Sequence, residues 1–583
     1  MPGAPLQTAS PRPEWQLKEK PSAQRIHSLA DALGVNASLA TLLLQRGVET
    51  FDQAKTFFRP SLDQLCDPFA MKDMDKAAGR LARAMEQKER VLVYGDYDVD
   101  GVTAVAMCCS FLQKLGLSID FYIPSRHQEG YGLSRASAAR ALQGHDLVIT
   151  LDCGIRSVDA IGAIQGQGVD VIVCDHHEPG ATIPPALAVL DPKRPDCAYP
   201  YKMLSGCGVA FKLLQAFAQH QNFSLEALYE QLDLVALSIA CDLVDLTGEN
   251  RILAYYGLQR LRDSPRPGIK ALMDSSRLLG HVHIDQLVFR VGPRINAPGR
   301  IDHAKLSVAL LLSKELEQAR PLSEAIEAKN AQRRALDART TAEALAQLEC
   351  HDAIERKTTV LCAPHWDRGI VGIVAARCVE HVFRPTVVLA ASDGIATGSA
   401  RSVPGFNIYE ALTACSDLLI RYGGHAFAAG LSLRLEHVTA FAKRFEEVVQ
   451  ETIQPAHLVP VQPIDLALPL TEIDRKFCAV LQQMGPFGPK NMRPVFVSEH
   501  LKASRCVVLR EHHLKLVLHT IDNPELTFSA IGFHMAAHAP TLRNGQPFQA
   551  AYTLQEDPFD DKRWQFQLKD IHPESLDDDR STH

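Results

Sequence analysis

The chain has 583 residues, too many for one hydrophobic core, so roughly three or four domains are expected. Apolar residues make up 46% and charged residues 22% of the sequence, which excludes the composition of a disordered chain. The formal net charge of −7 argues against a protein that coats nucleic acid without specificity. It does not exclude a nucleic-acid ligand, because binding depends on where cations cluster.

Compartment and redox state follow from the apolar runs and the cysteines. No stretch approaches the roughly 20 apolar residues that a membrane span requires, and residues 1–20 lack the apolar core of a signal peptide. The 14 Cys are scattered without a Cys-x-x-Cys pair, as expected of reduced thiols. We therefore expect a cytoplasmic protein with neither a zinc site nor a disulfide framework.

The first large unit alternates strand-like and helix-like segments. Residues 1–75 are predicted to form a mobile arm and short amphipathic helices. From Val91 the apolar runs VLVYGD, IDFYIP, DLVITLDCG and VDVIVCDHHEPG are separated by helix-like segments. Such alternation indicates a parallel sheet covered on both faces. We predict a doubly wound α/β domain over residues 76–312.

Three further segments follow. Residues 313–350 are rich in Ala, Glu, Arg and Leu and predict a long connecting helix. A second, smaller α/β domain is expected over 351–457, with the Gly-rich run YGGHAFAAG inside it. Period-2 alternation over 458–572 predicts a small antiparallel β-barrel, most simply an OB-fold. The acidic residues 573–583 are expected to be a disordered tail.

Polar side chains follow the strands of the first α/β domain, where doubly wound sheets bind their ligands. In chain order these are Asp96, Asp98, Asp100, Asp152, Asp175, His176, His177 and Asp242. One such Asp is most often a helix cap, but clustered carboxylates raise one another's pKa unless a cation neutralises them. Asp and His ligands suit Mg²⁺ or Mn²⁺. Two such ions about 4 Å apart stabilise phosphoryl transfer, so we predict a metal-dependent phosphodiester hydrolase.

Ordered motifs support a family resemblance. The runs GDYDVDG (95–101), TLDCG (150–154) and DHH (175–177) resemble the motifs of the DHH phosphoesterases, and within them those of the RecJ single-strand-specific exonucleases. Further runs that resemble theirs are RHQEGYGLS (126–134), VGPRINAPGRIDHA (291–304), GSARSVPGFN (398–407), YGGHAFAAG (422–430) and GPFGPKNMRPVF (485–496). The resemblance covers nearly the whole chain.

The resemblance implies roles for individual residues. It makes metal ligands of Asp98, Asp100, Asp152, His176 and Asp242. His177 is either a ligand or the group that faces the scissile phosphate, and Asp96 is either a ligand or an anchor for one. We expect Asp175 to hydrogen-bond to a ligand His. Asp245 is the rival of Asp242.

The same resemblance implies an activity. It is that of a single-stranded-DNA-specific exonuclease, which releases 5′-mononucleotides from the 5′ end by two-metal-ion hydrolysis in DNA repair and recombination. A single-strand-binding protein and a helicase are the expected partners of a monomeric enzyme. Two alternatives remain: a family member that cleaves short oligonucleotides or cyclic dinucleotides, and a catalytically silent replication or repair scaffold, which should have lost metal ligands.

Candidate DNA-binding residues lie in the other motifs. Ser399 and Arg401 occupy a Gly-containing turn that suits phosphate, and His425 follows two glycines. The remaining arginines of these motifs are Arg126, Arg294 and Arg300. Tyr131 and Phe406 are either base-stacking residues or turn plugs. In the barrel, a DNA-binding face or ordinary solvent exposure explains the alternation of Lys502, Arg505, Arg510 and Lys515 with apolar residues.

Overall fold

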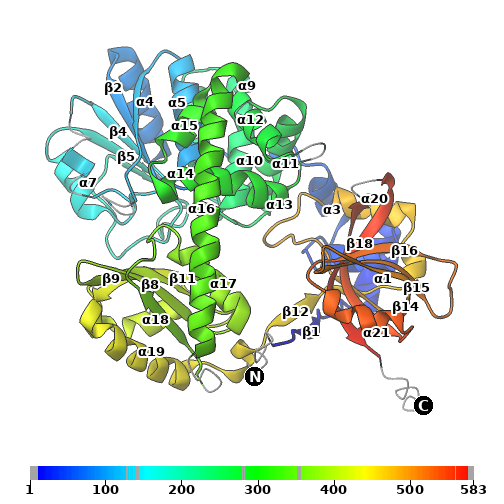
Figure 1. Ribbon diagram of the computed structural model, residues 1–583. Coiled ribbons are helices and arrows are strands. Elements are labelled where there is room, and N and C mark those ends of the chain that lie inside the picture. The colour runs from blue at the N-terminus through cyan, green and yellow to red at the C-terminus, as the bar shows by residue number, and fades with distance from the viewer. Residues whose placement is uncertain are drawn as a thin grey trace. The chain divides into compact units, whose positions relative to one another are not determined.

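The computed structural model describes residues 11–574 apart from 127–128, 130–131, 135–136, 140–142, 279, 281, 351–355 and 558–559. Contacts divide the chain into two compact units. The first unit contains Gln64–Pro460, and the second combines Glu14–Asp63 with the chain from Val461 onward. The predicted fold class is confirmed: two α/β domains joined by a long helix, and a C-terminal β-barrel (Figure 1).

The first α/β domain contains a parallel sheet in the order β3-β2-β4-β5-β6. Its strands are β2 (Arg90–Gly95), β3 (Ser118–Tyr122), β4 (Leu147–Leu151), β5 (Asp170–Cys174) and β6 (Ala188–Leu190). The central strands are buried apolar runs because helices cover both faces of the sheet. The strand order reverses between β2 and β4, and a doubly wound sheet places its binding crevice at this point.

Helices surround this sheet and continue beyond it. They are α4 (Met74–Gln87), α5 (Val99–Lys114), α7 (Val158–Gln165), α8 (Gly206–His220), α9 (Glu226–Tyr229), α10 (Leu232–Cys241), α11 (Gly248–Asp263), α12 (Pro267–Ser275), α13 (Ile284–Gln286), η3 (Leu287–Val291), α14 (Gly292–Ile301) and α15 (Lys305–Leu312). The helix α16 (Leu316–Cys350) packs against α12, α14 and α15 and, further along, against the second domain (Figure 1).

The second α/β domain is a mixed five-stranded sheet in the order β10-β11-β9-β8-β7. Its elements are β7 (Thr359–Ala363), α17 (Val371–Val382), β8 (Thr386–Ser392), β9 (Ile395–Arg401), α18 (Ile408–Thr413), β10 (Arg421–Gly424), β11 (Ala428–Arg434) and α19 (Val438–Thr452). β9 and β11 pair antiparallel, with Ala428 opposite Arg401. This register brings the turn between β10 and β11 next to the end of β9.

The second unit is a closed barrel with N-terminal helices packed on it. The barrel strands are β14 (Phe496–Leu509), β15 (His513–Thr520), β16 (Phe528–Gly532), β17 (Phe548–Asp557) and β18 (Asp560–Pro573), and β14 pairs with β17 to close it. Helices α1 (Ala23–Leu33), α2 (Ala37–Leu44) and α3 (Phe51–Phe58) share its core. Sequence patterns give no sign of this association, because its two parts are separated by the whole first unit.

Hydropathy along the described helices adds one finding. None of these helices is, taken singly, long and apolar enough to cross a membrane. The pair α1 and α2 meets the criteria of length and composition only when joined across a 109° bend.

Candidate metal centre

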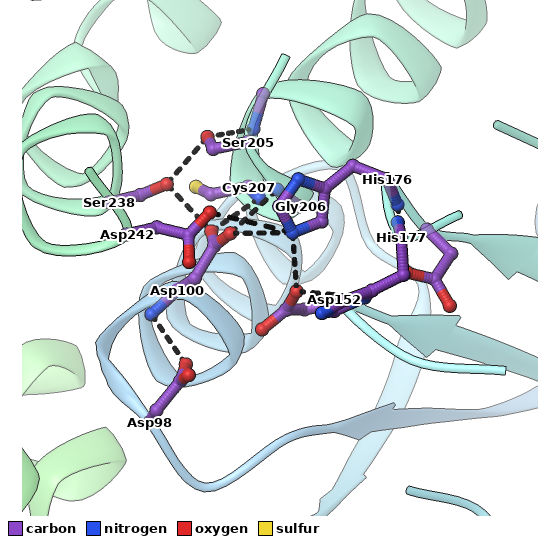
Figure 2. A network of polar contacts seen from close by, with 12 residues as sticks. Asp98, Asp100, Asp152, His176, His177, Ser205, Gly206, Cys207, Ser238 and Asp242 are labelled. Carbon is purple, nitrogen blue, oxygen red and sulfur yellow. Dashed lines mark hydrogen bonds and ion pairs between the residues drawn. The ribbon is translucent and has the colours of Figure 1, made fainter. Parts of the chain in front are cut away.

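Seven predicted side chains gather at the carboxyl edge of the first sheet (Figure 2). Their potential ligand atoms lie within 4.8 Å of one another in three groups: Asp96, Asp98 and Asp152; Asp152, His176 and His177; and Asp100, His176 and Asp242. Asp152 and His176 each belong to two of the groups. The groups therefore overlap, which is the arrangement required for two neighbouring cations that share ligands.

His176 is buried at the centre of the cluster. Its Nε2 lies 3.2 Å from Asp152 Oδ1, 3.5 Å from Asp242 Oδ2 and 3.7 Å from Asp100 Oδ2 (Figure 2). Within the described part of the chain this buried nitrogen makes no hydrogen bond. Burial lowers the pKa of His176 to about 4, so the imidazole is neutral and offers a lone pair, as a metal ligand must.

The carboxylates around His176 are crowded. Burial, followed by the charges of neighbouring carboxylates, raises the pKa of Asp96, Asp98, Asp152 and Asp242. Asp96 Oδ1 is also buried without a hydrogen bond in the described structure. Crowded buried anions with an unsatisfied oxygen require a cation. The oxygen-rich donor set with imidazole fits Mg²⁺ or Mn²⁺.

Asp175 lies behind the histidines rather than among the ligand groups. Its Oδ1 accepts a hydrogen bond of 2.7 Å from His177 Nδ1, and its Oδ2 accepts one from the Ile155 amide. Burial alone would raise the pKa of Asp175, but the hydrogen bond and charge of His177 lower it to about 2. The carboxylate therefore fixes the orientation of the His177 ring, whose Nδ1 also lies 4.0 Å from Asp152 Oδ1 of the cluster.

Asp100 is held by the start of α8, which the sequence did not indicate. Its carboxylate accepts hydrogen bonds of 2.7 Å from the Gly206 and Cys207 amides and one of 2.6 Å from Ser238 Oγ (Figure 2). A Cβ added at Gly206 would lie 2.7 Å from Asp152 Oδ1. Available signals were the small residues after Ser205 and the single polar side chain in LVALSIAC.

Three acidic candidates remain, and the geometry distinguishes Asp98 and Asp242 from Asp245. Asp98 is the N-cap of α5, accepting from the Asp100 and Gly101 amides. Asp242 follows the last residue of α10 and belongs to a ligand group, whereas Asp245 belongs to none among the described residues. The Asp245 carbonyl instead accepts hydrogen bonds from Tyr201 and Asn250.

Beside the acidic cluster lies a cluster of arginines from both α/β domains: Arg126, Arg300 and Arg401. Burial, together with the charges of the neighbouring arginines, lowers the pKa of Arg300 to about 10. Burial and the charge of Arg126 also lower the pKa of Arg401. Arg126 lies 4.0 Å over the Tyr97 ring, and Arg401 donates to Ser399 Oγ at 2.7 Å. Neither Arg126 nor Arg401 forms an ion pair with any residue that the structure describes. Such like charges favour a bound anion.

Of the other residues predicted to contact DNA, one lies at the site and the rest do not or cannot be placed. His425, at the β10–β11 turn, stacks on His177 with ring centroids 6.2 Å apart, so it joins the site. Arg294 does not, because its guanidinium pairs with Glu327 of α16 at 2.6 Å. Phe406 is buried in the core of the second α/β domain, where a base cannot reach it, and Tyr131 lies outside the described residues.

Two basic side chains near His425 were not anticipated. Burial lowers the pKa of His425, and the charges of His177, Arg156 and Lys193 add to that effect. Arg156 follows β4 and Lys193 follows β6, each a few residues beyond the strand end. Sequence motifs gave no reason to prefer them over other surface cations.

The barrel arranges most of its predicted cations on one face. In the antiparallel register of β14 and β15, Lys502 lies opposite His519, Arg505 opposite Val517 and Lys515 opposite Val507. Leu514, Leu516 and Leu518 are buried, so the alternate side chains of β15, and those paired with them, point outward. Lys502, Arg505 and Lys515 therefore share the outer face of β14 and β15.

Comparisons with known proteins agree with this architecture. The family models "DHH family, N-terminal domain", "DHHA1 domain" and "RecJ OB domain" match residues 90–239, 356–451 and 464–570. Three relatives are named single-stranded-DNA-specific exonuclease RecJ. The one from Dickeya dadantii is 34% identical over 94% of this chain and 97% of its own length, and that from Escherichia coli is 34% identical over 84% and 88%. The one from Bacillus subtilis is 37% identical over 89% of this chain, which spans 66% of that relative.

Solved structures give the same result. RecJ from Thermus thermophilus in complex with Mn²⁺ superposes with a TM-score of 0.82 at 29% identity, covering 97% of this chain and 80% of that one. The Mg²⁺ complex gives 0.76 at 26%, covering 97% and 79%. By sequence, domain composition and fold, the chain belongs to the RecJ family, within the DHH family.

Proposed function

We propose that the protein is a single-stranded-DNA-specific exonuclease that hydrolyses phosphodiester bonds with two divalent ions, Mn²⁺ or Mg²⁺. The observation that carries the proposal is the pair of adjoining clusters, one of overlapping ligand groups and one of buried arginines whose like charges lower one another's pKa. Relatives with this name, at 34% identity over nearly their whole length, support the substrate class.

In this proposal each cluster has a distinct task. Asp96, Asp98, Asp100, Asp152, His176 and Asp242 would hold the ions, and Asp152 and His176 each belong to two of the three ligand groups. Bound ions lower the pKa of water and neutralise charge that develops on the phosphoryl oxygens. Arg126, Arg300 and Arg401, with Ser399, bind phosphate next to the cluster. His177, oriented by Asp175, is either a further ligand or a hydrogen-bond donor to the scissile phosphate.

The proposal extends to direction and context. We infer cleavage from the 5′ end with release of 5′-mononucleotides, action as a monomer in the cytoplasm, and a role in DNA repair and recombination. A single-strand-binding protein and a helicase would supply and open the substrate. Family membership supports these inferences.

A digestion experiment tests the function. Single strands labelled at the 5′ or the 3′ end, blunt duplexes and a dinucleotide are incubated with Mg²⁺, Mn²⁺ or a chelator. We expect mononucleotides from the 5′ end of long single strands, no product with the chelator, and resistance of blunt duplex. Faster turnover of the dinucleotide would identify a small-phosphoester enzyme, and no cleavage at all would favour the scaffold.

Asp242 and Asp245 form a matched pair for mutation. Asp242→Asn should lower cleavage about a hundredfold or more, because it removes a carboxylate from the ligand group of Asp100 and His176. Asp245→Asn makes the same change to a carboxyl that follows the same helix but belongs to no ligand group among the described residues. Isothermal titration of Mn²⁺ and cleavage rates compare the two. Equal losses in both variants would contradict the assignment.

The barrel face makes a separate prediction. Replacing Lys502, Arg505 and Lys515 by Ala should weaken single-strand binding and lower the slope of log affinity against log salt by up to about two. Metal affinity and cleavage of very short strands should not change. Fluorescence anisotropy at several salt concentrations measures the slope. The control replaces Lys55, Arg475 and Lys476, exposed cations on helices of the same unit. An unchanged slope in the first variant would make the face a solvent-exposed or partner-binding surface.

A further inference from the structure

An exposed aromatic residue lies in the turn that carries His425 and that adjoins Arg401. Phe427 is 66% exposed, and among the described large apolar side chains only Phe289, at 77%, is more exposed. It lies in the turn between β10 and β11, two residues after His425. His425 stacks on His177 of the metal centre. The residue after Phe427, Ala428, pairs with Arg401 of the arginine cluster.

The turn holds Phe427 in a fixed position. The Ser402 amide donates to the Phe427 carbonyl at 2.9 Å, and the Ile408 amide donates to the Ala426 carbonyl at 3.0 Å. The His425 amide closes the turn on the Ala428 carbonyl at 2.8 Å. The exposed ring is therefore presented from a rigid backbone, which is what a residue that positions a ligand requires.

Exposure alone would not identify a function, since single exposed apolar side chains are ordinary on protein surfaces. Phe427 differs because of its neighbours. Before it in the chain lies His425, which stacks on His177 of the metal centre. After it lies Ala428, which pairs with Arg401, and Arg401 donates to Ser399. A nucleotide whose phosphates are held by these two groups presents its base within the same short stretch of protein surface.

We propose that Phe427 is the stacking platform for the base of a nucleotide that adjoins the scissile phosphate. This inference rests on the proposed function and adds a positioning residue to it. An aromatic ring stacks on any base without reading sequence. A base of a single strand can rotate to stack on the ring, whereas in a duplex pairing with the other strand holds the base inside the helix. The ring thus contributes to the preference for single strands independently of the phosphate contacts.

A cycle that removes the ring and the base in turn tests the proposal. Phe427→Ala and the wild-type protein are compared on single strands that carry an abasic site at the first, second or third position from the cleaved end, and on the intact strand. On the intact strand we expect a rise in KM of roughly five- to a hundredfold, as base–aromatic stacking predicts, with a smaller change in kcat. At one of the three abasic positions, the KM of the wild type should rise by that same factor. The KM of Phe427→Ala should not rise further at this position, because the ring that would stack on the missing base is already gone.

Two further variants make the result specific. Phe427→Trp retains a ring and should restore binding of the intact strand. Phe289→Ala removes a still more exposed Phe of the same unit that belongs to neither cluster, and it should leave the response to abasic sites as in the wild type. Because the Phe427 ring is exposed, the melting temperature of Phe427→Ala should match that of the wild type.

The outcomes are distinguishable. The stacking role is wrong if Phe427→Ala cleaves the intact strand like the wild type. It is also wrong if Phe427→Ala cleaves every abasic strand less well than the wild type by one and the same factor. If the wild type itself cleaves no single strand, the proposed function fails and the stacking role with it. Rescue by Trp together with a lost response at one abasic position supports the proposal.

Discussion

Asp152→Asn is expected to reduce strand cleavage about a hundredfold or more without lowering the stability of the metal-free protein. Asp152 belongs to two of the three ligand groups, so its loss affects both ion positions. The backbone there has a φ of 59°, a left-handed conformation that Asn adopts readily. Asn also keeps the shape of the side chain. The substitution therefore removes charge and ligand strength with little effect on the fold.

The stability of the metal-free variant follows from the pKa. Burial and the charges of Asp100 and Asp98 raise the pKa of Asp152 well above its ordinary value of 3.8. A carboxyl whose pKa is raised in the folded state binds its proton more tightly in the folded than in the unfolded protein. Its contribution to the free energy of unfolding therefore falls as the pH rises above the ordinary pKa of the unfolded state. Asn has no such proton. In chelator at neutral pH the melting temperature of the variant should equal or exceed that of the wild type.

A matched control exists at the end of β6. Asp191 is a buried carboxyl whose pKa is raised to about 7, chiefly by burial, and it belongs to no ligand group among the described residues. Asp191→Asn should likewise hold or raise the metal-free melting temperature while retaining cleavage. For a metal ligand we expect at least about a hundredfold loss of activity. If Asp152→Asn keeps more than about a tenth of the wild-type activity, Asp152 is not a ligand common to both ion positions.

Much of the clustering of the candidate metal ligands was predictable because it depends on local order. Parallel strands end at one edge of a sheet, so residues that follow β2, β4 and β5 must lie close together. The order of strands and motifs in the sequence is sufficient to place Asp152 and His176 near each other in this way. The choice between Asp242 and Asp245 required the end of α10, because a helix turns 100° per residue and a small error in its end changes which side chain faces the site.

Contacts between distant segments were not predictable. The support of Asp100 by Gly206 and Ser238 depends on where two helices pack, and neither residue carries a motif of its own. Arg294 lies in the same motif as Arg300, yet it pairs with Glu327. A motif gives the residue type, but only the tertiary structure shows whether an Arg meets a carboxylate or another Arg. The association of α1 to α3 with the barrel is a further example.

Arg401→Ala is expected to lower turnover on every sequence by on the order of a hundredfold, because a phosphate displaced by about 1 Å reacts that much more slowly. Binding should weaken to the same extent on all strands, since phosphate contacts carry no sequence information. The slope of log affinity against log salt should fall by about one. Single-turnover cleavage and anisotropy on strands of different sequence provide these values.

Arg294→Ala is the matched control, because it removes an arginine whose charge is already neutralised by Glu327. Its turnover should stay near that of the wild type. An equal loss in both variants would mean that general positive charge, not the arginine cluster, holds the strand. A loss confined to particular sequences in Arg401→Ala would contradict a phosphate contact.

Stability separates a ligand-binding arginine from a structural one. Burial and the charge of Arg126 lower the pKa of Arg401, which means that the folded, ligand-free protein holds this cation at an energetic cost. Arg401→Ala should therefore keep or raise the melting temperature without DNA, while the stabilisation gained on adding a single strand shrinks. Arg294→Ala should do the reverse, because Glu327 loses its 2.6 Å ion pair with Arg294 and keeps only the longer one with Arg334, at 3.3 Å. An arginine that destabilises the free protein and stabilises the complex is retained for the anion it binds.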